Sequence, residues 1–304
     1  MQRTVSTAVL TAVCGICAMA STVRAQELEP RLLTNVPVGT NFVVAGYAFA
    51  RGNILLDPAL PIEDLNANLH TFIGAYVRAI NVFGLSGKVD AVVPFAAGDW
   101  TGRLEGLDTA RSATGFGDPR IRLAVGFVGA PALAKREWVE WSQRTIVGAS
   151  VQLIVPLGQY DSTELINLGS NRWTVRTQLG VSHALGAWIL EAAGTAWLFT
   201  DNTNFLGGQE LQQRPLFAAK GHVIRSLPDG WWISLGVGYG SGGRSLVNGV
   251  ERDTRISTFR LGATLAAALG KGHSLKLVLN SGVRLERGPD FDAVALAYQY
   301  LWGG

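Results

Sequence analysis

The run that most resembles a binding or catalytic motif is Gly238-Tyr239-Gly240-Ser241-Gly242-Gly243-Arg244-Ser245, which contains a Gly-x-Gly-x-x-Gly spacing. In a phosphate-binding loop such glycines open a helix whose first amides hold the anion, and a lysine reaches the phosphates. Here Arg244 takes the place of that lysine, and the following Leu246-Val247-Asn248-Gly249 is typical of a turn. We therefore interpret the glycines as a strand end that leaves space beside it, and we expect no nucleotide and no other cofactor.

Histidines are the other residues that could do chemistry, as bases or as metal ligands. The four are His70, His183, His222 and His273. No two of them have the spacing that puts two ligands on one face of a helix or a strand, so no metal site is predicted. No histidine has a serine on its own strand face at the spacing that a hydrolase needs, whereas a pair formed across two strands stays open.

The segments that carry these residues alternate between polar and apolar positions. Between Arg172 and Ser182 the odd positions hold Trp173, Val175, Thr177, Leu179 and Val181, and the even positions are polar or small. A strand separates such sets onto two faces, whereas a helix would mix them. The predicted strands are residues 40–51, 69–81, 87–98, 116–128, 144–157, 171–184, 187–200, 213–227, 230–241, 254–268, 273–286 and 291–302.

Composition agrees with strands that cross a membrane. Of the 304 residues 48% are hydrophobic and only 16% charged, which is atypical of a soluble cytosolic enzyme and of a disordered chain. Beyond residue 25 no run of about 20 apolar residues could form a membrane-spanning helix. An even number of strands, with mostly short turns at one end and long loops at the other, is typical of outer-membrane barrels. The predicted fold is all-β, a transmembrane antiparallel up-and-down β-barrel of about 12 strands.

Two details of this layout stay unresolved by the pattern. The connection Gly129–Gln143 is too long for the end at which short turns are expected, and residues 287–290 are too short for a loop. In residues 40–51 both faces are equally apolar, so their inward face is not assigned.

The chain begins like an exported protein. Arg3 supplies a positive start, residues 5–20 are apolar and small, and Val23-Arg24-Ala25 offers a cleavage site before Gln26. We therefore predict a signal peptide over residues 1–25 and one barrel domain over 26–304, located in the bacterial outer membrane.

Cleavage would also remove both cysteines, Cys14 and Cys17, so the mature chain would hold no disulfide. Without Arg3 and Arg24 the chain keeps 24 basic and 23 acidic residues, so its charge gives no reason to expect nucleic-acid binding.

One face of the predicted strands is rich in basic residues, and we expect it to line the pore. The predicted lining residues are Arg78, Lys88, Arg120, Arg122, Arg144, Arg172, Arg176, Glu191, Lys220, His222, Arg260, Lys276 and Arg284. A barrel must keep charges away from lipid, which explains their place but not their sign. A basic lining lowers the electrostatic barrier for anions, so the solute is hypothesised to be an anion.

Aromatic residues near the strand ends fit the girdles that barrels place at the two membrane interfaces. We predict an aromatic girdle formed by Trp100, Trp173, Trp188, Trp231, Tyr300 and Trp302.

Three short motifs carry a family resemblance: Gly115-Phe116-Gly117-Asp118, Val155-Pro156-Leu157-Gly158-Gln159-Tyr160 and Asn167-Leu168-Gly169-Ser170-Asn171-Arg172-Trp173. With their order and spacing, residues 40–302 resemble the outer-membrane proteins named for the meta-pathway of phenol degradation. The resemblance implies a barrel-type transporter linked to the breakdown of aromatic compounds, and an aromatic carboxylate as one possible anion. The insert 130–143 and the end Trp302-Gly303-Gly304 depart from the usual barrel pattern.

The predicted function is passive uptake of small hydrophobic or aromatic compounds, anions among them, without catalysis. Its expected partners are the lipid bilayer with lipopolysaccharide, the barrel assembly machinery and a small-molecule solute; the oligomeric state stays open. The alternatives are a closed structural or adhesive barrel that displays its loops, an outer-membrane lipid hydrolase, and a soluble β-sandwich. A sandwich would need an opposing sheet over apolar rows such as Leu275, Leu277 and Leu279.

Overall fold

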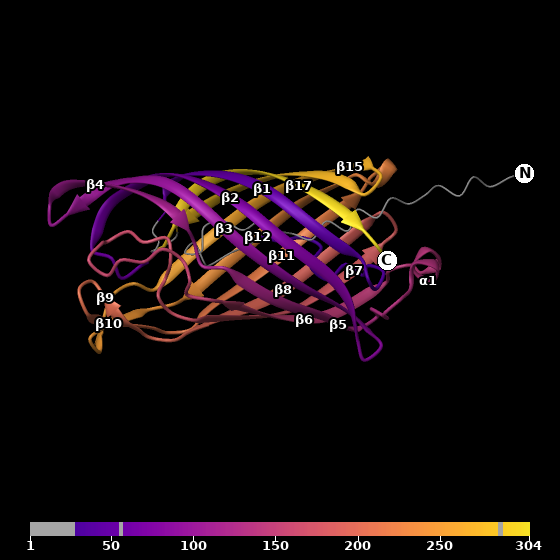
Figure 1. Ribbon diagram of the computed structural model, residues 1–304, viewed down its shortest axis with the longest axis horizontal. Coiled ribbons are helices and arrows are strands. Elements are labelled where there is room, and N and C mark those ends of the chain that lie inside the picture. The colour runs from indigo at the N-terminus through magenta and orange to yellow at the C-terminus, as the bar shows by residue number, and fades with distance from the viewer. Residues whose placement is uncertain (1–27, 55–56, 285–287) are drawn as a thin grey trace, which may run out of the picture.

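The computed structural model describes residues 28–54, 57–284 and 288–304, and these form a closed antiparallel barrel of twelve strand positions with tilted strands (Figure 1). The predicted fold class is therefore confirmed. The predicted signal peptide, residues 1–25, with Cys14 and Cys17, lies outside the described residues.

The barrel strands have the following bounds. They are β1 (Asn41–Asn53), β2 (Ile62–Val82), β3 (Leu85–Leu104), β4 (Leu107–Phe116), β5 (Arg120–Val128), β6 (Thr145–Ile154), β7 (Thr174–Leu185), β8 (Trp188–Phe199), β11 (Leu216–Ser226), β12 (Trp232–Gly242), β15 (Ile256–Gly270), β16 (His273–Arg284) and β17 (Asp290–Trp302). Four short strands form a second sheet in the loops: β9 (Asn202–Phe205), β10 (Gln209–Gln213), β13 (Ser245–Val247) and β14 (Val250–Glu251). The helices are α1 (Lys135–Glu140) and the 3₁₀ turn η1 (Pro228–Gly230). None of the helices in the described part of the chain is long and apolar enough to cross a membrane.

The ring is closed by the pairings of β1 and β2. β1 pairs with β2 on one side and with β17 on the other, and β2 also pairs with β3. β3 is so long that it pairs with both β4 and β5, which share one position of the ring. Residues 117–119, with a proline that cannot donate to the ladder, separate these two strands. The single segment predicted over 116–128 thus consists of the last residue of β4, the break at 117–119 and β5.

The two ends of the barrel differ. The C-terminus and α1 lie at one end, which we name the turn end, and β4, β9 and β10 lie at the opposite loop end (Figure 1). The unusually long connection Gly129–Gln143 is confirmed, and it contains α1. The second sheet at the loop end had no counterpart in the sequence prediction, because its strands of two to five residues are too short to give a periodic signal.

Side chains alternate between the lumen and the outer surface, as the sequence pattern predicts. Along β12 the buried Trp232 and Ser234 alternate with the exposed Ile233, Leu235 and Val237. Leu235 is 64% exposed, so in a membrane its side chain would be in contact with lipid.

A charged side chain at this position tests that orientation. We expect Leu235→Arg to lower the free energy of unfolding by about 2–4 kcal/mol, because it puts a charge on the lipid face. Urea titration of the protein folded into lipid vesicles measures this change. Val250→Arg, in the loop-end sheet, is the matched control and should change it by less than about 0.5 kcal/mol. Equal stability of the two variants would contradict a lipid-facing Leu235.

Candidate functional site

The lumen at the turn end is filled by residues 28–40, which we name the N-terminal plug. Leu28, Leu32 and Val36 of this segment are buried. The backbone N–H of Arg31 donates to Glu191 Oε2 of β8 (2.8 Å), and the Arg31 guanidinium lies 5.3 Å from the ring of Trp232 on β12. Because these partners point inward from different strands, the plug lies across the inside of the barrel.

Arg122 of β5 joins the plug to the wall. Its Nη1 donates to Glu29 Oε2 (2.7 Å) and its Nε to Asp90 Oδ2 of β3 (2.8 Å), and all three side chains are at most 5% exposed. Lys88 Nζ donates to the backbone carbonyls of two plug residues, Leu32 and Thr34. Burial of an unpaired charge is costly, so the plug supplies acceptors that these cations need. Two of the predicted basic lining residues are therefore already engaged by the plug.

The long connection between β5 and β6 contacts the plug at the turn end. Trp138 Nε1 of α1 donates to the Asn35 carbonyl (3.1 Å), and Asn35 Nδ2 donates to the Pro131 carbonyl (3.0 Å). The N–H of Val38 donates to the carbonyl of Leu133 (2.9 Å). These contacts give the unusual length of this connection a structural reason.

Apolar side chains close the lumen at the loop end. We name them the outer cluster: Ala50, Ile54, Leu60, Leu65, Ala67, Leu69, Ala96, Trp100, Ile166, Leu168, Phe205, Leu211, Val247, Phe291 and Ala293. Several of its members come from loops that fold into the barrel instead of extending into solvent. The lumen is thus apolar at the loop end and blocked by the plug at the turn end.

Arginines on the wall and in the loops next to this cluster lie against aromatic rings. The guanidinium carbon of Arg172 lies 5.0 Å from the centre of the Phe199 ring, that of Arg176 5.2 Å from Trp197, and that of Arg260 4.2 Å from Phe291. Such contacts stabilise a cation most where water is excluded. The interior therefore offers cations and aromatic faces side by side.

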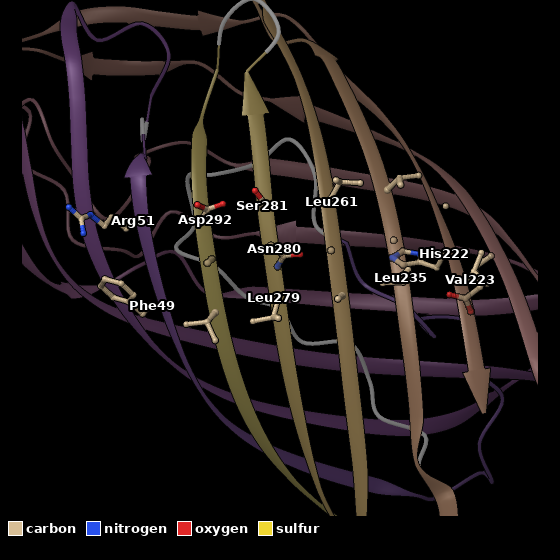
Figure 2. A pocket seen from close by; sticks show the side chains of 18 of the residues that line it. Phe49, Arg51, His222, Val223, Leu235, Leu261, Leu279, Asn280, Ser281 and Asp292 are labelled. Atoms are coloured by element: carbon tan, nitrogen blue, oxygen red, sulfur yellow. The ribbon is translucent and has the colours of Figure 1, made fainter. Parts of the chain in front are cut away.

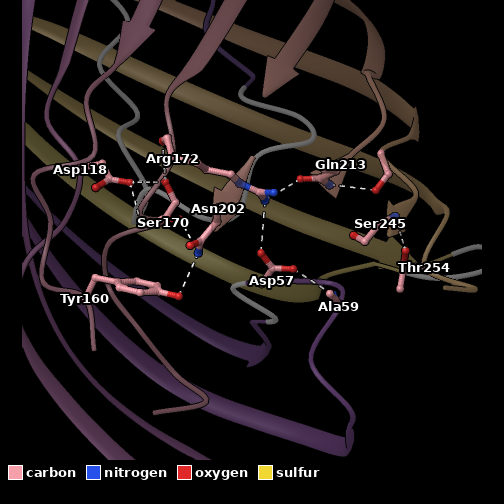
Figure 3. A network of polar contacts seen from close by, with 11 residues as sticks. Asp57, Ala59, Asp118, Tyr160, Ser170, Arg172, Asn202, Gln213, Ser245 and Thr254 are labelled. Atoms are coloured by element: carbon pink, nitrogen blue, oxygen red, sulfur yellow. Dashed lines mark hydrogen bonds and ion pairs between the residues drawn. The ribbon is translucent and has the colours of Figure 1, made fainter. Parts of the chain in front are cut away.

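Asp118 joins the three sequence motifs at the loop end (Figure 3). Its Oδ1 accepts from the N–H of Gly158 (2.9 Å), and its Oδ2 accepts from the N–H (2.9 Å) and the Oγ (2.6 Å) of Ser170. The close approach explains two glycines, since a methyl group on Gly158 would lie 2.8 Å from the Asp118 nitrogen and one on Gly169 2.6 Å from Gly158. The motifs therefore fasten the loop that follows β6 to the interruption between β4 and β5.

Arg172 connects the same loop to the first one (Figure 3). Its Nη2 donates to Asp57 Oδ2 (3.2 Å) and to Gln213 Oε1 (2.7 Å). Beside it, Asn202 Nδ2 donates to the hydroxyl of Tyr160 (2.9 Å), and burial raises the pKa of that tyrosine. Three loops thus meet over the barrel mouth through side-chain contacts.

The structure places most of the predicted lining residues on the inward face. These are Lys88, Arg120, Arg122, Arg176, Glu191, Lys220, His222, Arg260 and Lys276. Arg172 is buried in the loop network, and Arg144 is exposed at the turn end just before β6. The prediction for Arg78 is corrected, since it shares the outer face of β2 with the exposed Phe72 and Tyr76. The side chain of Arg284 lies outside the described residues.

Of the six residues predicted to form an aromatic girdle, five are exposed and Trp100 is buried. Trp173, Trp188, Trp231, Tyr300 and Trp302 are exposed at strand ends. Trp100 is only 2% exposed, belongs to the outer cluster and donates through Nε1 to the Ile54 carbonyl (3.2 Å). Its even position, shared with the inward Lys88 and Asp90 of β3, is the sequence signal that could have placed it inside.

Among the described residues, no histidine has the serine partner that a hydrolase would need. His70 bonds to Tyr47, His183 to Thr145 and His273 to Tyr298. His222 Nε2 is buried without a hydrogen bond. No described histidine is hydrogen-bonded to a serine, and no group of three metal-binding side chains occurs in the same residues.

A concave region of about 1060 Å³ lies on the outer surface of the wall (Figure 2). It is lined by exposed apolar side chains of neighbouring strands, including Leu235, Leu261 and Leu279. Lipid chains cover this surface in a membrane barrel, so the groove is not the functional site.

Sequence reasoning missed the residues whose partners are far away in the chain. Glu29 and Arg122 are 93 residues apart, and Asp118 and Ser170 are 52 apart. For Asp118 the available signal was its place in a short motif between glycine and proline.

These features define a class: a closed twelve-stranded barrel of the outer-membrane type, with a plug formed by its own N-terminal segment. Residues 39–298 match the family described as "Putative MetA-pathway of phenol degradation", and the chain belongs to that family. Its fold is similar to that of an outer membrane channel from Pseudomonas putida F1, with a TM-score of 0.75 and 21% identity over 91% of this chain and 100% of that one. The transport unit of the autotransporter AIDA-I from Escherichia coli is similar at a TM-score of 0.53 and 9% identity, over 92% and 94% of the chains. Among curated proteins none matches the sequence.

Proposed function

We propose that the protein is an outer-membrane channel for the passive uptake of small hydrophobic or aromatic compounds, anionic ones included. The solute moves down its gradient and no reaction is catalysed. The proposal includes export with removal of residues 1–25, insertion by the barrel assembly machinery, and a bilayer that contains lipopolysaccharide. Family membership and the channel from Pseudomonas putida F1, which has the same fold, support the proposal.

The observation that carries the proposal is the order of surfaces inside the barrel. The outer cluster presents apolar and aromatic side chains at the loop end. Next come buried arginines that lie against aromatic rings, such as Arg176 on Trp197 and Arg260 on Phe291. Apolar contacts suit an aromatic ring, and cations suit its carboxylate. A water-filled pore for hydrophilic solutes would instead need an open polar path.

Uptake into vesicles tests this function. Proteoliposomes that contain the refolded barrel should take up radiolabelled benzoate or toluene faster than empty liposomes, while a disaccharide such as sucrose stays outside. Benzoate should be favoured over an aromatic cation such as benzylammonium, because the inward charges are mostly basic. Equal rates for both would contradict the anion preference but not the proposal that the protein is a channel. No uptake of any aromatic probe would contradict that proposal.

A second candidate is a closed barrel that serves to display its loops. The observation in its favour is that the plug and the outer cluster fill the two ends of the lumen. For this candidate, aromatic uptake stays at the background of empty liposomes even after the plug is released from Arg122, as described in the Discussion.

A further inference from the structure

Three polar side chains on the inner wall lie close to glycines of neighbouring strands. A methyl group on Gly236 would lie 2.5 Å from the His222 ring, and one on Gly262 would lie 2.7 Å from Asn280 Oδ1. A methyl group on Gly282 would lie 3.5 Å from the guanidinium carbon of Arg260.

These side chains form one patch because their strands are adjacent in the order β11, β12, β15 and β16. His222 pairs with Gly236, Gly236 with Gly262, and Gly262 with Asn280 in one row across the four strands. Figure 2 shows Asn280 on β16 and His222 on β11, at the two sides of this row. Arg260 pairs with Gly282 in the neighbouring inward row.

The patch has buried polar atoms that no described residue satisfies. Arg260 is 4% exposed, and its Nε and Nη2 have no hydrogen-bond partner. Asn280 Oδ1 and His222 Nε2 are buried without a partner as well. Native proteins rarely leave such atoms unpaired, and an unpaired cation is the most costly case.

The two unpaired nitrogens of Arg260 lie on the same edge of the guanidinium. Nε–H and Nη2–H point in one direction and form the fork that binds both oxygens of a carboxylate. One face of the same group is covered by the Phe291 ring at 4.2 Å. The ring therefore restricts the guanidinium on one face, while the Nε–H and Nη2–H groups of the fork have no hydrogen-bond partner among the described residues.

We propose that Arg260, with Asn280 beside it, forms a binding site for a small aromatic carboxylate that also carries a hydroxyl group. The carboxylate accepts both N–H groups of the Arg260 fork, and the hydroxyl donates to Asn280 Oδ1. Diagonal neighbours on adjacent strands are about 7–8 Å apart, which is close to the span of a benzene ring with one substituent at each end. Phe291, a member of the outer cluster, supplies an apolar surface for the ring.

This inference rests on the proposed function in one respect, since the solute must reach the lumen. Binding in detergent micelles does not require transport, so the two are tested separately. Isothermal titration of the refolded full-length protein with 4-hydroxybenzoate measures the dissociation constant. We expect saturable binding by the wild type and a loss of about tenfold or more in affinity for Arg260→Gln.

Three comparisons make the test specific. Arg225→Gln removes an arginine that also lies on an aromatic ring, 4.8 Å from Trp188, but on the outer face of β11, and it should bind like the wild type. Asn280→Leu should abolish the preference for 4-hydroxybenzoate over benzoate while benzoate itself still binds. Arg260→Lys keeps the charge but not the fork, so it should bind more weakly than the wild type even if Arg260→Gln fails to fold.

The outcomes separate the two proposals. Absent binding by the wild type, or undiminished binding by folded Arg260→Gln and Arg260→Lys, would overturn the site. Equal binding of acetate and 4-hydroxybenzoate would overturn the aromatic ligand. Binding that depends on Arg260 together with no uptake into vesicles would keep the site and contradict the channel.

Discussion

Arg122→Glu is expected to raise the ion conductance of the barrel severalfold in planar bilayers. Arg122 is the residue that joins Glu29 of the plug to Asp90 of the wall. The substitution puts three carboxylates into a buried space, where like charges repel strongly. Removal of one partner from a buried ion pair costs about 3–5 kcal/mol. The least expensive response is for the plug, which is not part of the sheet, to leave the lumen.

A charge exchange separates this explanation from a general loss of structure. In the double variant Arg122→Glu with Glu29→Arg, the pair between plug and wall can form again with the charges reversed, and conductance should fall back toward the wild-type level. Arg225→Glu, on the outer face of β11, is the control and should leave conductance unchanged. Wild-type conductance in folded Arg122→Glu would show that the plug is held by its other contacts. Heat-dependent migration on a denaturing gel reports whether each variant has folded.

Asp118→Ala is expected to release the loop between β6 and β7 while the barrel stays folded. Its carboxylate accepts from the N–H of Gly158 and from both the N–H and the hydroxyl of Ser170. Hydrogen bonds to a charged group contribute about 1.5–3 kcal/mol each. The two backbone hydrogen bonds that remain, from Val155 to Pro119 and from Gln159 to Phe116, contribute only about 0.5–1.5 kcal/mol each. The loop should then become a site of rapid cleavage, with trypsin cutting after Arg172 at least tenfold faster than in the wild type.

Mass spectrometry of the fragments identifies the bond that is cut. Asp99→Ala is the matched control, because Asp99 also accepts from a serine, Ser112 (2.6 Å), but its side chain is exposed. That variant should be cleaved like the wild type. Asp118→Asn keeps an acceptor oxygen without the charge and should fall between the two. Equal resistance of Asp118→Ala and the wild type would mean that the apolar contacts of the loop, not Asp118, hold it in place.

The barrel was predictable from sequence because alternation is a local property. Each strand reports its own two faces, so the strand positions and most inward residues follow without knowledge of any partner. Arg176 and Trp197 lie as the pattern places them, on the inward faces of β7 and β8. The number of ring positions also follows, since each requires only its own periodic segment.

Arg78 shows where the polarity rule fails. We expected the charged face of β2 to point inward, but the inward face carries Ile73, Ala75 and Val77. These residues pack in a cluster with Val36 of the plug, so part of the lumen is an apolar core. Arg78 extends instead from the outer face at the turn end, where its Nη1 donates to Asn41 (3.3 Å). The alternation within a strand does not indicate that the N-terminal plug will fill the barrel.

Trp100 shows a related limit at the opposite end. An aromatic residue near a strand end suits a membrane interface, and that expectation assumes that loops extend into solvent. Here the loops fold inward, so Trp100 meets Ile54 and Leu168 in the outer cluster. The loop contacts of Asp118 and Arg172 escaped prediction for the same reason, because each is made between distant parts of the chain.

The position of the plug in the chain also allows it to be seated before the ring closes. The plug directly precedes β1, and β1 completes the ring only by pairing with β17, the last strand to be synthesised. Its contacts with Lys88, Arg122 and Trp138 belong to the first half of the chain and are available while the sheet is still open, whereas those with Glu191 and Trp232 need the strands that follow. The seam between β1 and β17 can therefore close around a segment that is already in place, so that nothing has to be threaded through a finished barrel.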